Sequence, residues 1–139
     1  MPADAWLRPV LADLVGAIDL AAIDAAVGTS YWETATRVSP LTDDEIVSAV
    51  SERLRLPAAK RLLASSQARE RVPEELARRY RILPLSVTGD TLEIATANPY
   101  DMDCERMLAF ASGRKVRMLL APPSRIDRRI DEVYRPEDA

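Results

Sequence analysis

The spacing of apolar residues changes near residue 70, and this change constrains the fold more than any other feature of the sequence. Before it, apolar residues recur every three or four positions, which is typical of amphipathic helices. After it, short apolar segments are separated by turn residues, and two of them flank the turn Thr88-Gly89-Asp90. Such a pair predicts a β-hairpin, and the alternation over Val116–Leu120 predicts a third strand.

Helices are expected to alternate with these strands. Pro73 suits the first turn of a short helix before the hairpin. Asn98-Pro99 predicts a turn after it, and Asp101 then caps a helix that ends at Gly113. Pro122-Pro123 begins the last helix. The expected order is α-β-β-α-β-α, so the predicted fold class is α+β, with helices packed on a small three-stranded sheet.

The N-terminal half is predicted to be a helical subdomain. Thr42 and Glu45 have the spacing of a capping box at the start of a helix. A further helix is expected over Ala58–Ser65, and Gln67–Arg71 is interpreted as a polar joint. We therefore expect a helical subdomain over residues 1–66, an α+β module over 67–134 and a polar tail over 135–139.

Composition argues against catalysis. The chain of 139 residues has no histidine, one cysteine (Cys104) and four glycines. The commonest general base is therefore missing, zinc and iron–sulfur sites are excluded, and no glycine-rich phosphate loop is present. We predict no catalytic, metal or cofactor-binding residue and no cofactor. An enzyme that uses carboxylates alone is the remaining alternative, and it requires a concave site with perturbed acids.

The net charge and the length of the apolar runs limit which classes of partner and which cellular compartment are expected. A formal net charge of −3 without a Lys/Arg block argues against nucleic acid as a partner. No apolar run approaches the ~20 residues that span a bilayer, so direct membrane insertion is not expected. A single cysteine fits a reducing compartment. The expected location is the cytoplasm.

Three sequence segments carry a family resemblance. Val72–Leu85 reads VPEELARRYRILPL, Gly89–Pro99 reads GDTLEIATANP, and Gly113–Val116 reads GRKV. Their order and spacing resemble the N-terminal domain of bacterial type II secretion and type IV pilus assembly ATPases. Leu41–Pro57 is similar to the helical segment that precedes this region in the family. The resemblance covers about Ser30 to Tyr134.

The resemblance implies a function. In the family this domain precedes a hexameric ATPase and docks on the cytoplasmic part of an inner-membrane platform protein. By resemblance, the chain is a non-catalytic adaptor recruited to the inner-membrane face. The ATPase itself is missing from the chain, which is either a piece of a longer enzyme or a stand-alone adaptor. The initial Met favours the stand-alone adaptor.

One branch of the family binds cyclic di-GMP through a repeated motif that begins Arg-Leu-Gly. That opening falls on Ser30-Tyr31-Trp32 here, and a later glycine falls on Ser39. Both the arginine and the glycines are lost, and with them phosphate contact and close backbone approach. Tyr31-Trp32-Glu33 instead resembles the Leu-Trp-Glu variant of the docking branch. A cyclic di-GMP-sensing regulatory domain is therefore the disfavoured alternative.

Two aromatic residues and an apolar stripe are the candidate partner surface. The stripe is expected on one face of the first helix, which then lies either in a partner's groove or against the chain's own helices. Trp32 is either packed in the core or a docking anchor. The candidate partner-binding residues are Trp6, Leu7, Leu11, Leu14 and Trp32, and Ile18 continues the stripe.

A group of arginines in the C-terminal half is a possible basic surface. Interleaved acids favour instead a solvated helix face. The arginines concerned are Arg78, Arg79, Arg81, Arg125, Arg128 and Arg129.

Overall fold

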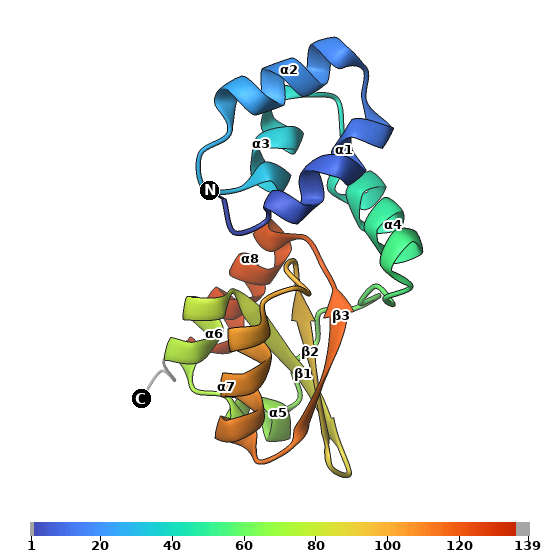
Figure 1. The fold of residues 1–139 in the computed structure, drawn as a ribbon. Helices are drawn as coiled ribbons and strands as arrows, with labels where there is room; N and C mark the ends of the chain where they lie inside the picture. Colours follow the sequence, from blue (N-terminus) through green and yellow to red (C-terminus); the bar gives the residue numbers. More distant parts are fainter. Residues whose placement is uncertain (1, 136–139) are drawn as a thin grey trace. The chain divides into compact units, whose positions relative to one another are not determined.

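The computed structural model describes residues 2–135, and the chain separates into two compact units, Met1–Leu56 and Pro57–Ala139 (Figure 1). The expected boundary between residues 66 and 67 falls inside the second unit. Residues 57–65 belong there because the Pro57 carbonyl accepts a hydrogen bond from the Leu120 amide at 2.9 Å, and the Ala59 amide donates to the Leu120 carbonyl at 2.8 Å. Of the expected polar tail, residues 136–139 lie outside the described part of the chain.

The first unit is helical. Its core consists of apolar side chains from every one of its elements, among them Leu7, Leu11, Ile23, Trp32 and Ile46. Its elements are the 3-10 turn η1 (Ala5–Leu7) and the helices α1 (Arg8–Leu14), α2 (Ala17–Ala26), α3 (Tyr31–Val38) and α4 (Asp43–Leu54).

Helix α4 begins at the predicted capping box. The Glu45 amide donates to the Thr42 hydroxyl at 3.2 Å, and the Thr42 amide donates to the Glu45 carboxylate at 3.1 Å. Each side chain thus satisfies a backbone N–H that has no partner within the helix. Acidic residues fill the first turn, where the helix dipole favours negative charge.

The predicted apolar stripe of the first helix is interrupted. Val15 and Gly16 are extended, so α1 and α2 are separate helices. The break changes the face on which later residues lie: Leu7 and Leu11 are buried, whereas Ile18 is 87% exposed. The expectation that Ile18 continues the buried stripe is therefore wrong.

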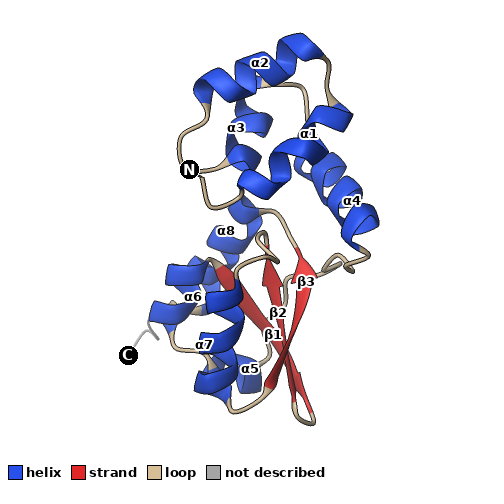
Figure 2. Cartoon of the chain, viewed as in Figure 1, coloured by secondary structure: helices blue, strands red, loops and turns tan. Residues whose placement is uncertain are grey.

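From α6 onward the second unit has the predicted order of helices and strands, and α5 is an additional helix before it. The strands follow the order β1-β2-β3, and the helices pack beside them (Figure 2). Its elements are α5 (Ser66–Arg71), α6 (Glu74–Tyr80), β1 (Ile82–Thr88), β2 (Thr91–Thr96), α7 (Met102–Ser112), β3 (Lys115–Leu120) and α8 (Pro123–Val133). The predicted α+β class is confirmed.

The sheet combines a hairpin with a crossover. Strands β1 and β2 are antiparallel around Gly89, whose φ of 59° suits a glycine. Strand β3 pairs parallel to β2, and α7 supplies the crossover that a parallel pair needs. The register of β1 shifts between Pro84 and Ser86, which fits a proline that cannot donate to the ladder.

The helix expected over Ala58–Ser65 is not formed. These residues have no helical structure, and Ala58 forms an isolated bridge with Leu120 at the end of β3. Hydrogen bonding to the sheet has replaced the local helical pattern. The polar joint expected over Gln67–Arg71 is instead the greater part of α5, which the Ser65 hydroxyl caps by accepting from the Ala68 amide at 3.1 Å.

None of the helices within residues 2–135 combines the length and the apolar composition needed to cross a bilayer.

Two helices end on an arginine in the left-handed conformation, Arg55 after α4 and Arg81 after α6, with φ of 52° and 51°. A side chain costs about 1 kcal/mol there, and glycine avoids this cost. Arg55 is exposed, so Arg55→Gly is expected to raise the free energy of unfolding by about 0.5–1 kcal/mol in urea denaturation.

Arg81→Gly is the matched control. Arg81 donates two hydrogen bonds to Asp127, at 3.1 and 2.6 Å, and their loss offsets the relief of strain. The Arg81→Gly substitution is therefore expected not to raise the free energy of unfolding. If Arg55→Gly lowered the free energy of unfolding as much as Arg81→Gly does, this result would contradict backbone strain at residue 55.

Candidate functional site

The Asp4 carboxylate lies at the N-terminus of α3 and is 8% exposed. It accepts hydrogen bonds from the Tyr31 amide at 2.7 Å, the Trp32 amide at 3.0 Å and the Ser30 hydroxyl at 2.9 Å. The first amides of a helix have no partner within it, and the helix dipole favours an anion there. Asp4 thus fixes the start of the chain against a helix that begins 27 residues later.

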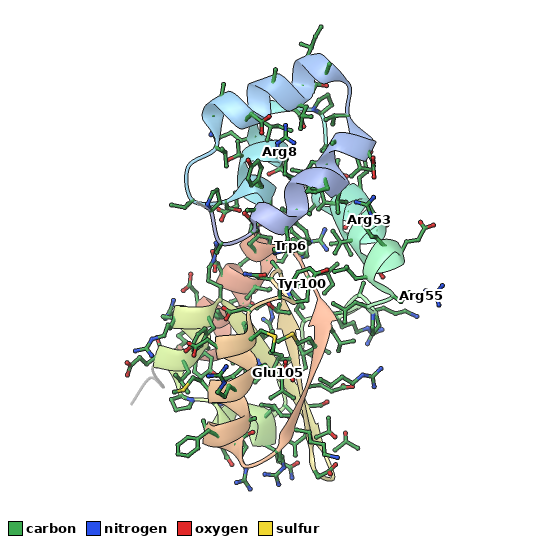
Figure 3. The ribbon with its side chains drawn as sticks, viewed as in Figure 1. Trp6, Arg8, Arg53, Arg55, Tyr100 and Glu105 are labelled. Atoms are coloured by element: carbon green, nitrogen blue, oxygen red, sulfur yellow. The ribbon has the colours of Figure 1, made fainter. Side chains whose placement is uncertain are left out.

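This attachment determines where the predicted partner residues lie. Leu7, Leu11 and Trp32 are buried in the core of the first unit, and the Trp32 indole donates to Asp43 at 3.0 Å. For these three side chains the burial favours packing against the chain's own helices. Trp6, labelled in Figure 3, is half-buried, and Leu14 is 38% exposed. Partner binding through any of the five residues stays a prediction.

Helix α2 carries an apolar surface that sequence reasoning missed. Every residue of α2 except Asp19 and Asp24 is apolar, yet Ile23 is its one buried residue. The exposed apolar residues repeat at intervals of three or four and therefore share one side of the helix. This α2 face consists of Ala17, Ile18, Ala21, Ala22 and Ala25. The signal was present in the composition of α2, where two aspartates are too few to form a full polar side for solvent.

Neither acid of α2 makes its exposed side strongly charged. Asp24 accepts two hydrogen bonds from Arg8, at 2.8 and 2.7 Å, and hydrogen bonding to the guanidinium lowers the pKa of that carboxyl. The pair cancels its own charge. Asp19 lies in the first turn, where the dipole favours it.

The arginines predicted on one solvated face form two groups. Arg78 pairs with Glu74 at 2.7 Å and with Asp131 at 2.8 Å, and Arg81 pairs with Asp127 at 2.6 Å. Arg79 pairs with Glu75 at 3.5 Å. These contacts are the interleaved acids that the sequence predicted. The other group consists of Arg125, Arg128 and Arg129 of α8, which line a pocket.

A pocket of about 530 Å³ lies between the 57–65 connector and α8 in the second unit. All the charged residues among those that line it are cations. Within residues 2–135, Lys60, Arg61 and Arg128 make no ion pair. We call it the basic pocket; it is lined by Ala59, Lys60, Arg61, Leu62, Leu63, Ala121, Pro122, Arg125, Arg128 and Arg129.

The titratable groups with shifted pKa values do not assemble a reactive site. Burial raises the pKa of the Cys104 thiol to about 12, so the thiol stays protonated near neutral pH. Burial also raises the pKa of Tyr134 to about 12, and its hydroxyl donates to the Val72 carbonyl at 2.7 Å. Among residues 2–135 no group of three or more acidic or cysteine side chains is placed to hold a metal ion.

Comparison with known proteins identifies the class. The model of the MshEN domain matches residues 52–139, which is more than half of the chain. The chain therefore belongs to the MshEN domain family, whose members form the N-terminal domain of type II secretion and type IV pilus assembly ATPases.

Two solved structures share the fold. The chain aligns with MshE, described with cdg, at a TM-score of 0.72 and 24% identity, covering 92% of this chain and 98% of that one. It aligns with the N-terminal domain of XpsE at a TM-score of 0.67 and 17% identity, covering 94% and 95%. The type IV pilus assembly ATPase PilB of Acinetobacter baylyi is 29% identical over 66 residues, which are 48% of this chain and 11% of that protein.

Asp4→Ala is expected to lower the free energy of unfolding of the first unit by about 2–3 kcal/mol, because the substitution leaves helix-terminal donors without their charged acceptor. Trp6 and Trp32 are the two tryptophans of the chain, so tryptophan fluorescence during urea denaturation reports on this unit. The exposed Glu52 provides the control, and Glu52→Ala is expected to change the free energy of unfolding by less than about 0.5 kcal/mol. Equal effects of the two substitutions would contradict the role of Asp4.

Proposed function

We propose that the chain is a non-catalytic protein-docking module of a type II secretion or type IV pilus-like system. Its partner is the cytoplasmic domain of an inner-membrane platform protein, and its place is the cytoplasmic face of the inner membrane. In this role it is an adaptor between the assembly ATPase and the platform. Family membership supports the system, and the α2 face supports docking.

The α2 face has the chemistry of an interface core. Helices that are apolar on every side are normally covered, and exposed apolar surfaces often mark protein contacts. The face has no charge to desolvate, as is typical of the centre of an interface. Ile18, at 87% exposure, offers a large side chain among alanines, and these let a partner helix approach closely. A helix of the partner laid along α2 is the contact we propose.

Sensing of cyclic di-GMP is the second candidate, and the observation in its favour is the likeness to MshE, which is described with cdg. At residues 30–32, where the family's binding motif would begin, the backbone donors of Tyr31 and Trp32 already bind Asp4. A phosphate at this position would lie next to the Asp4 carboxylate instead of next to an arginine. The two negative charges would repel each other. This contact favours docking over nucleotide sensing.

Ile18→Asp tests the proposed docking by placing a charge in the centre of the α2 face. The platform domain from the same host is titrated into the full chain by calorimetry. We expect the substitution to weaken binding by about ten- to a hundredfold, because it removes one buried apolar side chain and adds a charge that binding must desolvate.

Phe110→Asp is the matched control, because Phe110 is 86% exposed on α7 of the other unit. The Phe110→Asp variant is expected to bind the platform domain with the same affinity as the unchanged chain. Equal weakening by both substitutions, or no binding by the unchanged chain, would overturn the proposal. Sedimentation reveals whether a second copy covers the face instead: a dimer that Ile18→Asp dissociates, without platform binding, would assign the face to self-association.

A further inference from the structure

We propose that the basic pocket of the second unit binds an acidic segment of a partner protein, with carboxylates on its cations and an apolar side chain on its wall. This inference rests on the proposed function only in taking the partner to be a protein. It concerns a different unit of the chain and a different chemistry from the α2 face.

Three cations of the pocket, Lys60, Arg61 and Arg128, make no ion pair within the described residues, whereas Arg129 is paired with Glu132. The chain as a whole is acidic, with 22 Asp and Glu against 19 Lys and Arg, yet the described residues that line the pocket include no acid. On α8, Arg128 and Arg129 lie three and four positions after Arg125, a spacing at which like charges destabilise a helix. An acidic ligand would remove this repulsion, and its approach would be steered by the local positive potential.

The walls of the pocket are held in place by the fold. The Arg129 guanidinium Nε donates to the Leu62 carbonyl at 2.7 Å, which attaches the connector to α8. At the other end, Ala59 and Pro57 are bonded to Leu120 of β3. Residues more than 60 positions apart in sequence thus form one preformed site, as is usual for binding pockets.

The pocket also has an apolar part. Leu63 is 61% exposed in its lining, and Ala121 and Pro122 contribute further apolar surface. Arg61 and Lys60 precede the leucines directly in sequence. This combination suits a segment in which acidic and apolar residues are close neighbours better than it suits a bare anion.

The connector backbone is available for contact as well. Within the described residues, the backbone groups of Lys60, Arg61 and Leu63 make no hydrogen bond. A peptide brings its own donors and acceptors along its length, whereas a small anion has acceptors alone. The observations therefore favour a peptide segment over a phosphate.

The probe for this site is an acetylated and amidated 12-residue peptide with the repeat Glu-Glu-Leu, titrated into the 15N-labelled full chain. We expect saturable shifts of backbone amides confined to residues 59–63 and 121–129. Affinity is expected to fall as salt is added, because the contact is ionic and solvent-exposed. A peptide with the repeat Lys-Lys-Leu is the charge control and is expected not to bind.

The double substitution Arg61→Gln with Arg128→Gln is expected to weaken binding of the acidic peptide at least tenfold. The matched control is Arg37→Gln with Arg106→Gln, which removes two exposed arginines away from the pocket lining and is expected to leave binding unchanged. Three results would overturn the inference: no saturable shift, equal binding of the lysine peptide, or equal weakening by both double substitutions. Pyrophosphate that shifts the same amides when the acidic peptide does not would overturn it too, in favour of a small-anion site.

Failure here is distinguishable from failure of the proposed function. Acidic peptide binding at the pocket, with no binding of the platform domain, would retain the pocket and reject the platform as partner. Platform binding that depends on Ile18, with no peptide binding, would reject the pocket alone.

Discussion

The structure of the first unit depends on the Asp4 carboxylate at the N-terminus of α3. Its hydrogen bonds to the Tyr31 and Trp32 amides attach the first residues to a helix far along the chain. With the start of the chain held there, Leu7 and Trp32 pack in the core. The same carboxylate occupies donors that an anionic ligand would need, so one interaction both organises the unit and bears on what it can bind.

Local signals in the sequence predicted most of the second unit. The turn at Gly89 and the helix end at Gly113 both demand a left-handed residue, and both are where the spacing placed them. The order α-β-β-α-β-α, and with it the α+β class, followed from such punctuation. The helix expected over residues 58–65 was a wrong prediction because the backbone of this segment hydrogen-bonds to Leu120 and Leu85 of the sheet, which no local pattern reveals.

The candidate surfaces were less accessible to prediction for the same reason. A helical stripe indicates which residues share a face, but the break at Gly16 determines that Leu11 faces the core and Ile18 faces solvent. Likewise, Arg78 and Arg128 look equivalent in sequence. Arg78 meets Glu74 and Asp131, whereas Arg128 lines the basic pocket with residues of the distant connector. The two proposed surfaces lie on separate units, and one is apolar whereas the other is basic.

We infer that the Asp4 carboxylate occupies the donors at the start of α3 in place of an anionic ligand, which favours protein docking over nucleotide binding by the first unit. Calorimetric titration of cyclic di-GMP into the full chain tests it most directly, read together with amide shifts at Tyr31 and Trp32. We expect no saturable heat at ligand concentrations well above micromolar and no shift at these amides. Saturable heat accompanied by shifts at Tyr31 and Trp32 would contradict it.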